Sequence, residues 1–299
     1  MSNPFLDRVE KDAQSGYAGF GGRGDTTPKA ASAGTTAAMQ QQQLEQMWQQ
    51  PTTAHYPQGS PTRERAVTID DVMAKTGLLF GALLVAAVVA WWASATMPGV
   101  GTLLWGIGIV GTLGIGIALM FMKSVNVPLI VTYAVAEGLF VGAISQSYAN
   151  AFDGAATGEV LPWYQGIVFQ AVLATLCVFG AMLVLYRTGL VKVTQKFRAV
   201  VSMALVGYFI FALVNLVFSL VTQSSFGIGG TGALGIGISL FAIGLAAVTL
   251  MLDFDNIETA IATGAPEKYS WILAMGLIVT LVWLYLEILR LLGRLRSSD

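Results

Sequence analysis

Charged residues are scarce in this chain. Only 11% of its 299 residues are Asp, Glu, Lys or Arg, and 55% are hydrophobic, whereas charged residues make up about a quarter of a soluble domain. The mean hydropathy is +0.67, and we therefore expect a membrane protein. The formal net charge is -1 and the basic residues are scattered, so we expect neither a nucleic-acid partner nor an acidic substrate.

Cysteine and histidine are nearly absent. The only cysteine, Cys177, lies inside an apolar run, which excludes an internal disulfide and a zinc cluster built on paired cysteines. The only histidine, His55, belongs to the polar amino-terminal region, so a Ser–His or Cys–His catalytic pair cannot form within a membrane domain of this chain. We expect no enzymatic activity and no cofactor.

The chain does contain long apolar runs. Seven runs of about 20 residues are each long enough to cross a bilayer as a helix, and they lack the alternation of barrel strands. The predicted helices cover residues 77–96, 102–122, 127–148, 163–186, 200–222, 232–252 and 271–292. We predict an all-α membrane domain over residues 71–296. Residues 1–70 are rich in Gln, Gly, Ala and Thr, a composition typical of a disordered tail.

Basic residues predict the orientation of these helices, because Lys and Arg favour the cytoplasmic side. The positions that fall on one side when the amino terminus is cytoplasmic are Arg63, Arg65, Lys75, Lys123, Arg187, Lys192, Lys196, Arg198 and Lys268. An odd number of crossings puts Arg290, Arg294 and Arg296 outside, against the rule. Either the last run crosses despite them, or it re-enters the membrane and returns.

A glutamate stands in the middle of the third run. Glu137 is the eleventh residue of that run, too deep for its side chain to reach water along the helix, and a charge at that depth costs about 3 kcal/mol or more. We interpret it as a protonatable or cation-binding group on a pathway. The alternative is a neutral or hydrogen-bonded glutamate that only packs helices. Ala134, Gly138 and Gly142, spaced by four, predict a close helix contact on this segment.

Two aspartates end the sixth run, in LMLDFDNIETA. Asp253 and Asp255 point about 200° apart on a helix, so both cannot face the interior of a bundle. The face of Asp253 continues through Asn256, Ile257 and Ala260, mostly small or apolar positions, which makes Asp253 the better inward candidate. The alternative for each is an ordinary carboxylate at the cytoplasmic interface.

Another acid, Glu287, lies in the last run, three residues before Arg290 and seven before Arg294. A surface Glu/Arg pair is one interpretation, and an inward-facing ligand is the other. Hard cations bind several oxygen ligands, and a few carboxylates with backbone carbonyls suit a weak, transient site. Glu137 and Asp253 are the candidate ligands, without a firm metal site.

Three separated segments occur together in one known family, in the same order. They are YAVAEGLFVGAIS, LDFDNIE and LVWLYLEILRLLG. With MSNPF and TIDDVMAKTG, they resemble the Bax inhibitor family of multipass membrane proteins, in its bacterial branch with a long polar amino-terminal tail. The likeness covers about residues 66–293. It implies a multipass protein of the cell membrane, here the bacterial inner membrane.

The resemblance also implies a fold in which six helices surround a central seventh. Characterised members are described as pH-sensitive calcium leak channels, with a pair of aspartates near the cytoplasmic ends of the sixth and seventh helices. Eukaryotic relatives restrain cell death. Asp253 matches the first aspartate. An ungapped alignment places the second on Thr280, whereas matching YLE to the family's YLD places it on Glu287. Antiparallel geometry favours Thr280, because Glu287 would lie some 20 Å or more along its helix.

From these residues we hypothesise a ladder of acids around the last helix. Asp253 would lie near the cytoplasm, Glu137 at mid-depth and Glu287 in the outer half. Glu137 would be neutral while buried and ionised when water or a cation enters. Lys123 is a possible closed-state partner of Asp253, or an ordinary positive-inside lysine.

Three functions remain open from the sequence. The first is a passive, pH-modulated cation leak, with calcium favoured by the resemblance alone. The second is a non-conducting regulator of membrane proteases or stress responses, in which the buried acids pin helices together and the polar tail binds protein partners. A proton-coupled transporter is third, because the sequence shows no substrate site. The expected partners are the bilayer, calcium or protons, and membrane proteins.

Overall fold

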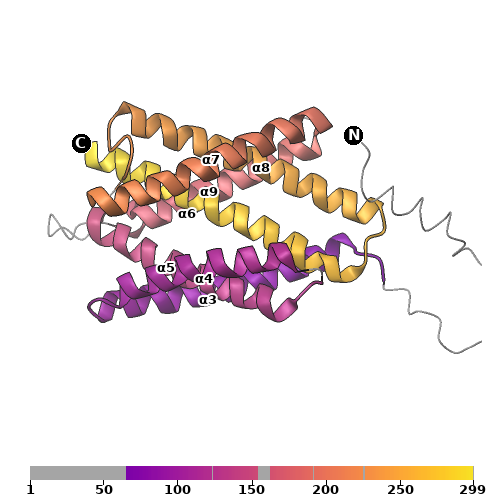
Figure 1. Ribbon diagram of the computed structural model, residues 1–299, viewed down its shortest axis with the longest axis horizontal. Coiled ribbons are helices and arrows are strands. Elements are labelled where there is room, and N and C mark those ends of the chain that lie inside the picture. Colours follow the sequence, from indigo (N-terminus) through magenta and orange to yellow (C-terminus); the bar gives the residue numbers. More distant parts are fainter. Residues whose placement is uncertain (1–64, 123, 154–161, 191, 225, 299) are drawn as a thin grey trace, which may run out of the picture. The chain divides into compact units, whose positions relative to one another are not determined.

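Seven long helices account for most of the computed structural model, which describes residues 65–122, 124–153, 162–190, 192–224 and 226–298. Each helix is long and apolar enough to cross a membrane, which confirms the all-α membrane fold (Figure 1). They are α3 (Ile69–Thr96), α4 (Val100–Phe121), α5 (Val127–Phe152), α6 (Ile167–Arg187), α7 (Gln195–Thr222), α8 (Ala233–Ala262) and α9 (Ser270–Ser298). Two short 3-10 helices, η1 (Trp163–Gln165) and η2 (Glu267–Tyr269), precede α6 and α9.

Several helices extend beyond the predicted apolar runs, because polar residues cap or continue them. Thr68 accepts the backbone N–H of Asp71 in a capping box, so α3 begins eight residues before the apolar run. The hydroxyl of Thr194 caps α7 in the same way. The largest difference concerns α8, which continues through DFDNIETAIA to Ala262. Asp253 therefore lies inside this helix, not at its end as predicted.

The chain segment before α3 is attached to the turn between α8 and α9. The N–H of Val67 donates to the carbonyl of Ala265 at 2.8 Å, and the N–H of Glu267 donates to that of Arg65 at 2.8 Å. Residues 65–70, which their composition assigns to the tail, thus belong to the helical domain. The rest of the predicted disordered tail, residues 1–64, lies outside the described residues.

The bundle has two ends, which we name by an arginine at each. At the Arg65 end, α3, α5, α7 and α9 begin and α4, α6 and α8 finish. At the opposite Arg294 end, the remaining helix ends meet. Side-chain contacts agree with this arrangement, since Lys75 of α3 donates to Ser270 of α9 at 2.6 Å, whereas Arg296 of α9 pairs with Asp153 at the end of α5.

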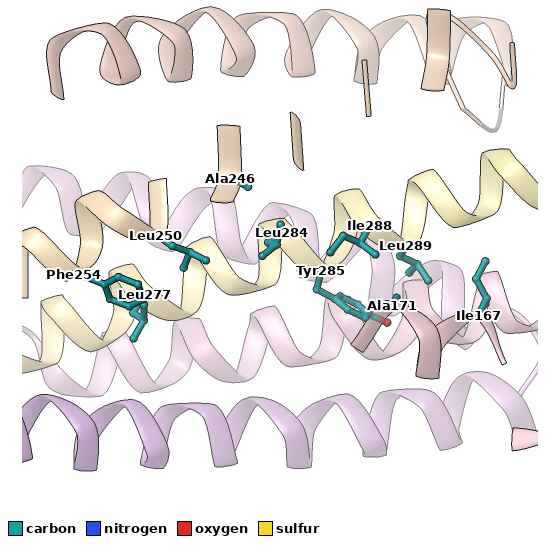
Figure 2. Packing of buried hydrophobic residues seen from close by; sticks show 10 residues of the cluster. All are labelled: Ile167, Ala171, Ala246, Leu250, Phe254, Leu277, Leu284, Tyr285, Ile288 and Leu289. Atoms are coloured by element: carbon teal, nitrogen blue, oxygen red, sulfur yellow. The ribbon is translucent and has the colours of Figure 1, made fainter. Parts of the chain in front are cut away.

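Helix α9 is the most buried of the seven helices. It packs against α3, α5, α6 and α8, while α4 packs on α3 and α5, and α7 packs on α8. Figure 2 shows the largest core cluster, in which side chains of α6 and α8 meet the face of α9 that carries Leu277, Leu284 and Ile288. A second cluster joins the opposite side of α9 to α3 and α5. The last helix is therefore the centre of packing in this domain.

Helices α3 and α5 approach each other at glycine, as the small-residue spacing predicted. A Cβ atom added at Gly138 would lie 2.3 Å from the carbonyl oxygen of Leu83, and one at Gly142 would lie 2.1 Å from that of Ala87. No side chain fits at these distances. The close contact fixes the rotation of α5 and with it the direction of Glu137.

Candidate functional site

Glu137 is buried on the packed face of α5. It is 5% exposed and lies beside the fully packed Gly138. Its Oε1 accepts a long hydrogen bond of 3.4 Å from the hydroxyl of Tyr133, one turn earlier. Its Oε2 is inaccessible to solvent and has no hydrogen-bond partner among the described residues. Among the residues that the structure describes, this carboxyl has one weak hydrogen-bond partner and no ion pair.

Asp253 occupies a similar setting on α8. Its Oδ2 is likewise buried without a hydrogen-bond partner in the described part of the chain. The hydroxyl of Thr280 on α9 lies beside this carboxyl, although it also donates to the carbonyl of Gly276 at 3.2 Å. The structure thus places Thr280, rather than Glu287, opposite Asp253. This is the register that the ungapped alignment favoured.

These two acids, each with one unpartnered oxygen, lie at a similar depth in the bundle. Glu137 is ten residues from the start of α5, Asp253 nine residues from the end of α8, and Thr280 ten residues from the start of α9. At roughly 1.5 Å per residue, each is about 15 Å from the Arg65 end. The predicted order, with Asp253 at one end and Glu137 at mid-depth, does not agree with this arrangement, because α8 is longer than its apolar run.

One segment of α9 separates Glu137 from Asp253. Ile278 and Val282 pack with Ala134 of α5 in the second core cluster. Thr280, two positions from each of them, points to the other side of the helix and faces Asp253. The acids therefore flank α9 at one level instead of following one another along it.

Glu287 is buried in a network of polar partners. It is 4% exposed, and both of its oxygens accept from Nη1 of Arg290, at 3.0 and 3.1 Å. Its Oε1 also accepts from the hydroxyl of Tyr208 on α7 and, at 3.4 Å, from the indole of Trp283. The pair with Arg290 that the sequence suggested is present, but it is internal instead of lying on the surface.

The next two arginines of α9 also form hydrogen bonds or ion pairs within the domain. Arg294 is 2% exposed and donates to the carbonyl of Phe226 at 3.1 Å and to Ser239 at 3.2 Å. Arg296 pairs with Asp153 at 2.6 Å. Because these arginines are engaged within the domain, they are not the free loop charges that the positive-inside rule counts.

The remaining predicted residues lie apart from these acids. Asp255 faces away from α9 and forms an ion pair with Arg198 of α7, which also donates to Asn256 at 2.5 Å. Lys123, the suggested closed-state partner of Asp253, lies outside the described residues.

Two cavities lie beside these residues. Glu287 lines one of about 400 Å³ at the Arg294 end. The other, of about 500 Å³, is apolar and lies among α3, α5, α6 and α9. Glu137 and Asp253 line neither of them, so the three acids of the predicted ladder do not meet in either cavity. Within the described ranges, no group of three His, Cys, Asp or Glu side chains is placed to hold a metal ion.

Sequence reasoning missed Tyr208 and the inward direction of Arg294. Tyr208 is 79 residues from Glu287, and nothing local relates the two. Arg294 did carry a signal, because it lies seven residues after Glu287 and hence on the same face of a helix. The sequence alone left open whether this face lies on the surface or inside the bundle.

Comparison with known proteins identifies one family. The family model described as Bax inhibitor 1 like matches residues 5–297, nearly the whole chain. Among curated proteins, no relative matches the chain.

Proposed function

The chain belongs to the Bax inhibitor 1 like family, and we propose that it forms a passive, pH-modulated cation leak across a membrane. The observation that carries this proposal is the pair of unpartnered carboxyl oxygens, Oε2 of Glu137 and Oδ2 of Asp253. Structural acids at bilayer depth are paired as a rule, and within the described ranges these two oxygens are not. Calcium is the cation that the family resemblance favours.

In this proposal the packing around α9 represents the closed state. Glu137 and Asp253 are neutral acids, because an ionised carboxylate without a partner costs far more at this depth. Ionisation of both acids draws in water or a cation, which separates the Ile278–Val282 segment of α9 from its neighbours. Oxygen ligands for the cation then come from the two carboxylates and from Thr280. The leak is expected to rise as pH rises, since only the ionised acids attract cations.

A second candidate function is a non-conducting regulator or scaffold of membrane proteins, without catalysis. The ion pairs Glu287–Arg290 and Asp255–Arg198 favour it, because acids paired with arginine hold helices together and do not bind a passing ion. In this function, Glu137 and Asp253 are packing residues as well.

Calcium flux into liposomes at several pH values distinguishes the two functions. The wild-type protein is compared with Glu137→Gln, Asp253→Asn and the control Asp255→Asn, which removes a carboxylate only two residues from Asp253. A leak predicts flux that rises with pH in the wild type and in the control, and a flat pH response in the other two variants. If wild-type liposomes are no leakier than empty ones at any pH, or if all three variants keep the wild-type response, the leak proposal is wrong.

A further inference from the structure

The cavity at the Arg294 end is built differently from the rest of the bundle. It encloses about 400 Å³ and is lined by residues of α4, α5, α7, α8 and α9. We propose that this cavity is a phospholipid site, in which the arginines of α9 bind the lipid's phosphate group. This proposal is independent of the leak, because neither Glu137 nor Asp253 lines the cavity.

The charges that line the cavity do not balance. Among its lining residues in the described chain, the charged ones are Glu287, Arg290 and Arg294, which leaves one positive charge in excess. Arg290 is bound to Glu287. Arg294 donates instead to uncharged groups, the carbonyls of Gly235 and Phe226 and a serine hydroxyl. A buried cation without a counter-charge is unfavourable, so an anion in the cavity stabilises the protein.

The donors fit an oxyanion with several acceptor oxygens. Arg290 lines the cavity, and its side chain is 35% exposed although it is bound to Glu287. Asn215 accepts the N–H of Ile228 through Oδ1 at 2.7 Å, which leaves its amide nitrogen as a donor. Tyr148 and Trp105 add a hydroxyl and an indole N–H to the lining. Planar guanidinium groups match the geometry of phosphate.

Part of the cavity lining is apolar, which favours a lipid over a free ion. Phe211, Leu216 and Leu220 of α7 line it together with Ile238 of α8. Helix α7 is also the least buried helix, and none of its most apolar window is buried in the domain. An acyl chain lying along α7 covers part of this surface, as the chains of the surrounding bilayer do elsewhere on the helix.

The depth of the arginines agrees with a headgroup position. Helix α9 has 29 residues, about 43 Å at 1.5 Å per residue, whereas the hydrocarbon layer is about 30 Å thick. Centred in a bilayer, the helix extends about 6 Å beyond the hydrocarbon at each end. Arg294 is four residues from the last one, which puts it at the boundary, and Arg290 is one turn deeper. Trp105 and Tyr148 belong to residue types that concentrate at the same boundary.

Native mass spectrometry of the full chain in a phosphate-free maltoside detergent tests the proposal with three probes. Dioctanoyl phosphatidylglycerol carries a phosphate group and acyl chains. Inorganic phosphate carries only the phosphate group, and dioctanoylglycerol carries only the acyl chains. We expect the phospholipid to bind more tightly than either of the others. Stronger or equal binding of inorganic phosphate would assign the cavity to a free ion, and equal binding of dioctanoylglycerol would assign it to apolar contact alone. Either result overturns the phospholipid assignment.

Variants that change the charge of the cavity make the test specific. Glu287→Gln removes the acid that competes for Arg290, so phospholipid binding should tighten by about tenfold, whereas Arg290→Gln should weaken it by about tenfold. Arg296→Gln is the matched control, since Arg296 lies on the same helix but pairs with Asp153 outside the cavity lining. If Glu287→Gln binds no tighter than the wild type, the proposal fails even where Arg290→Gln does not fold.

Discussion

Buried acids at two levels of the bundle differ in their hydrogen-bond partners. At the level of Glu137 and Asp253, each carboxyl keeps one oxygen without a hydrogen-bond partner among the described residues. About two turns further along α9, Glu287 has an arginine, a tyrosine and a tryptophan as partners. All three acids lie on or against the central α9, so burial alone does not decide which kind of environment an acid receives.

The difference shows which acid is structural and which two are candidates for function. Removing one partner of a buried, hydrogen-bonded ion pair is strongly destabilising. Such a pair therefore holds together the helices that supply its partners. An acid with one oxygen left without a partner and no ion pair adds little of that kind to stability as an ion. Glu287 therefore fastens α7 to α9 through Tyr208, whereas Glu137 and Asp253 are free to respond to their surroundings.

The largest loss of stability is expected from a substitution that separates α5 from α3 and so exposes Glu137. A side chain at Gly138 collides with the backbone of α3, so Gly138→Leu should separate α3 from α5 and destabilise the protein by at least about 3 kcal/mol. Unfolding in a denaturing detergent, followed by circular dichroism, measures this. At Gly207 of α7 no atom lies within 4 Å of an added Cβ, and Gly207→Ala should be neutral or slightly stabilising. Equal losses in both variants would contradict the close packing.

The next effect concerns the paired acid. Arg290→Gln leaves Glu287 buried with only Tyr208 and Trp283, and should cost about 2 kcal/mol, below the range for fully buried pairs because the arginine is partly exposed. The double variant Glu287→Gln/Arg290→Gln should recover most of that loss. A double-mutant cycle on unfolding free energies measures the coupling, and additive single effects would show that the pair contributes nothing.

A matched amide substitution compares the two levels directly. Glu137→Gln keeps the shape of a neutral acid and should change the unfolding free energy by less than about 0.5 kcal/mol, whereas Glu287→Gln weakens a charge-assisted bond and should cost about 1.5 kcal/mol. Both variants are measured by the same denaturation. The comparison fails if Glu137→Gln is the more destabilising of the two.

The smallest effect is expected at the partly exposed pair of Asp255 with Arg198. Asp255→Asn should change stability by less than about 1 kcal/mol, because water and salt screen such pairs. Its loss should shrink further in high salt. A larger loss than that of Glu287→Gln would mean that the Arg198 pair, and not the internal one, holds α7 in place.

Much of the fold follows from the sequence, because hydropathy decides it. The apolar runs give the number and nature of the helices, and the spacing of Ala134, Gly138 and Gly142 gives the α3–α5 contact. Helix ends were harder to predict. The sequence DFDNIETAIA is too polar for a hydropathy argument, yet it continues α8 by nearly three turns, and this extension moves Asp253 into the bundle.

The site was predicted less well, because it depends on contacts between distant segments. The 200° argument correctly separates Asp253 from Asp255, since a single helix determines it. The neighbours of Glu287 do not follow from one helix, because Tyr208 belongs to α7. The position of Thr280 opposite Asp253, by contrast, agrees with the register that the ungapped alignment and antiparallel geometry favoured.

The protonation state of Glu137 and Asp253 tests the central claim most directly. Infrared difference spectra of the reconstituted protein at neutral pH, wild type against Glu137→Gln, Asp253→Asn and Glu287→Gln, report the carbonyl stretch of protonated carboxylic acids. We predict that this band is present in the wild type, decreases in the first two variants and is unchanged in the third. A wild-type spectrum without the band, or a decrease in Glu287→Gln alone, would contradict the distinction between the two levels of the bundle.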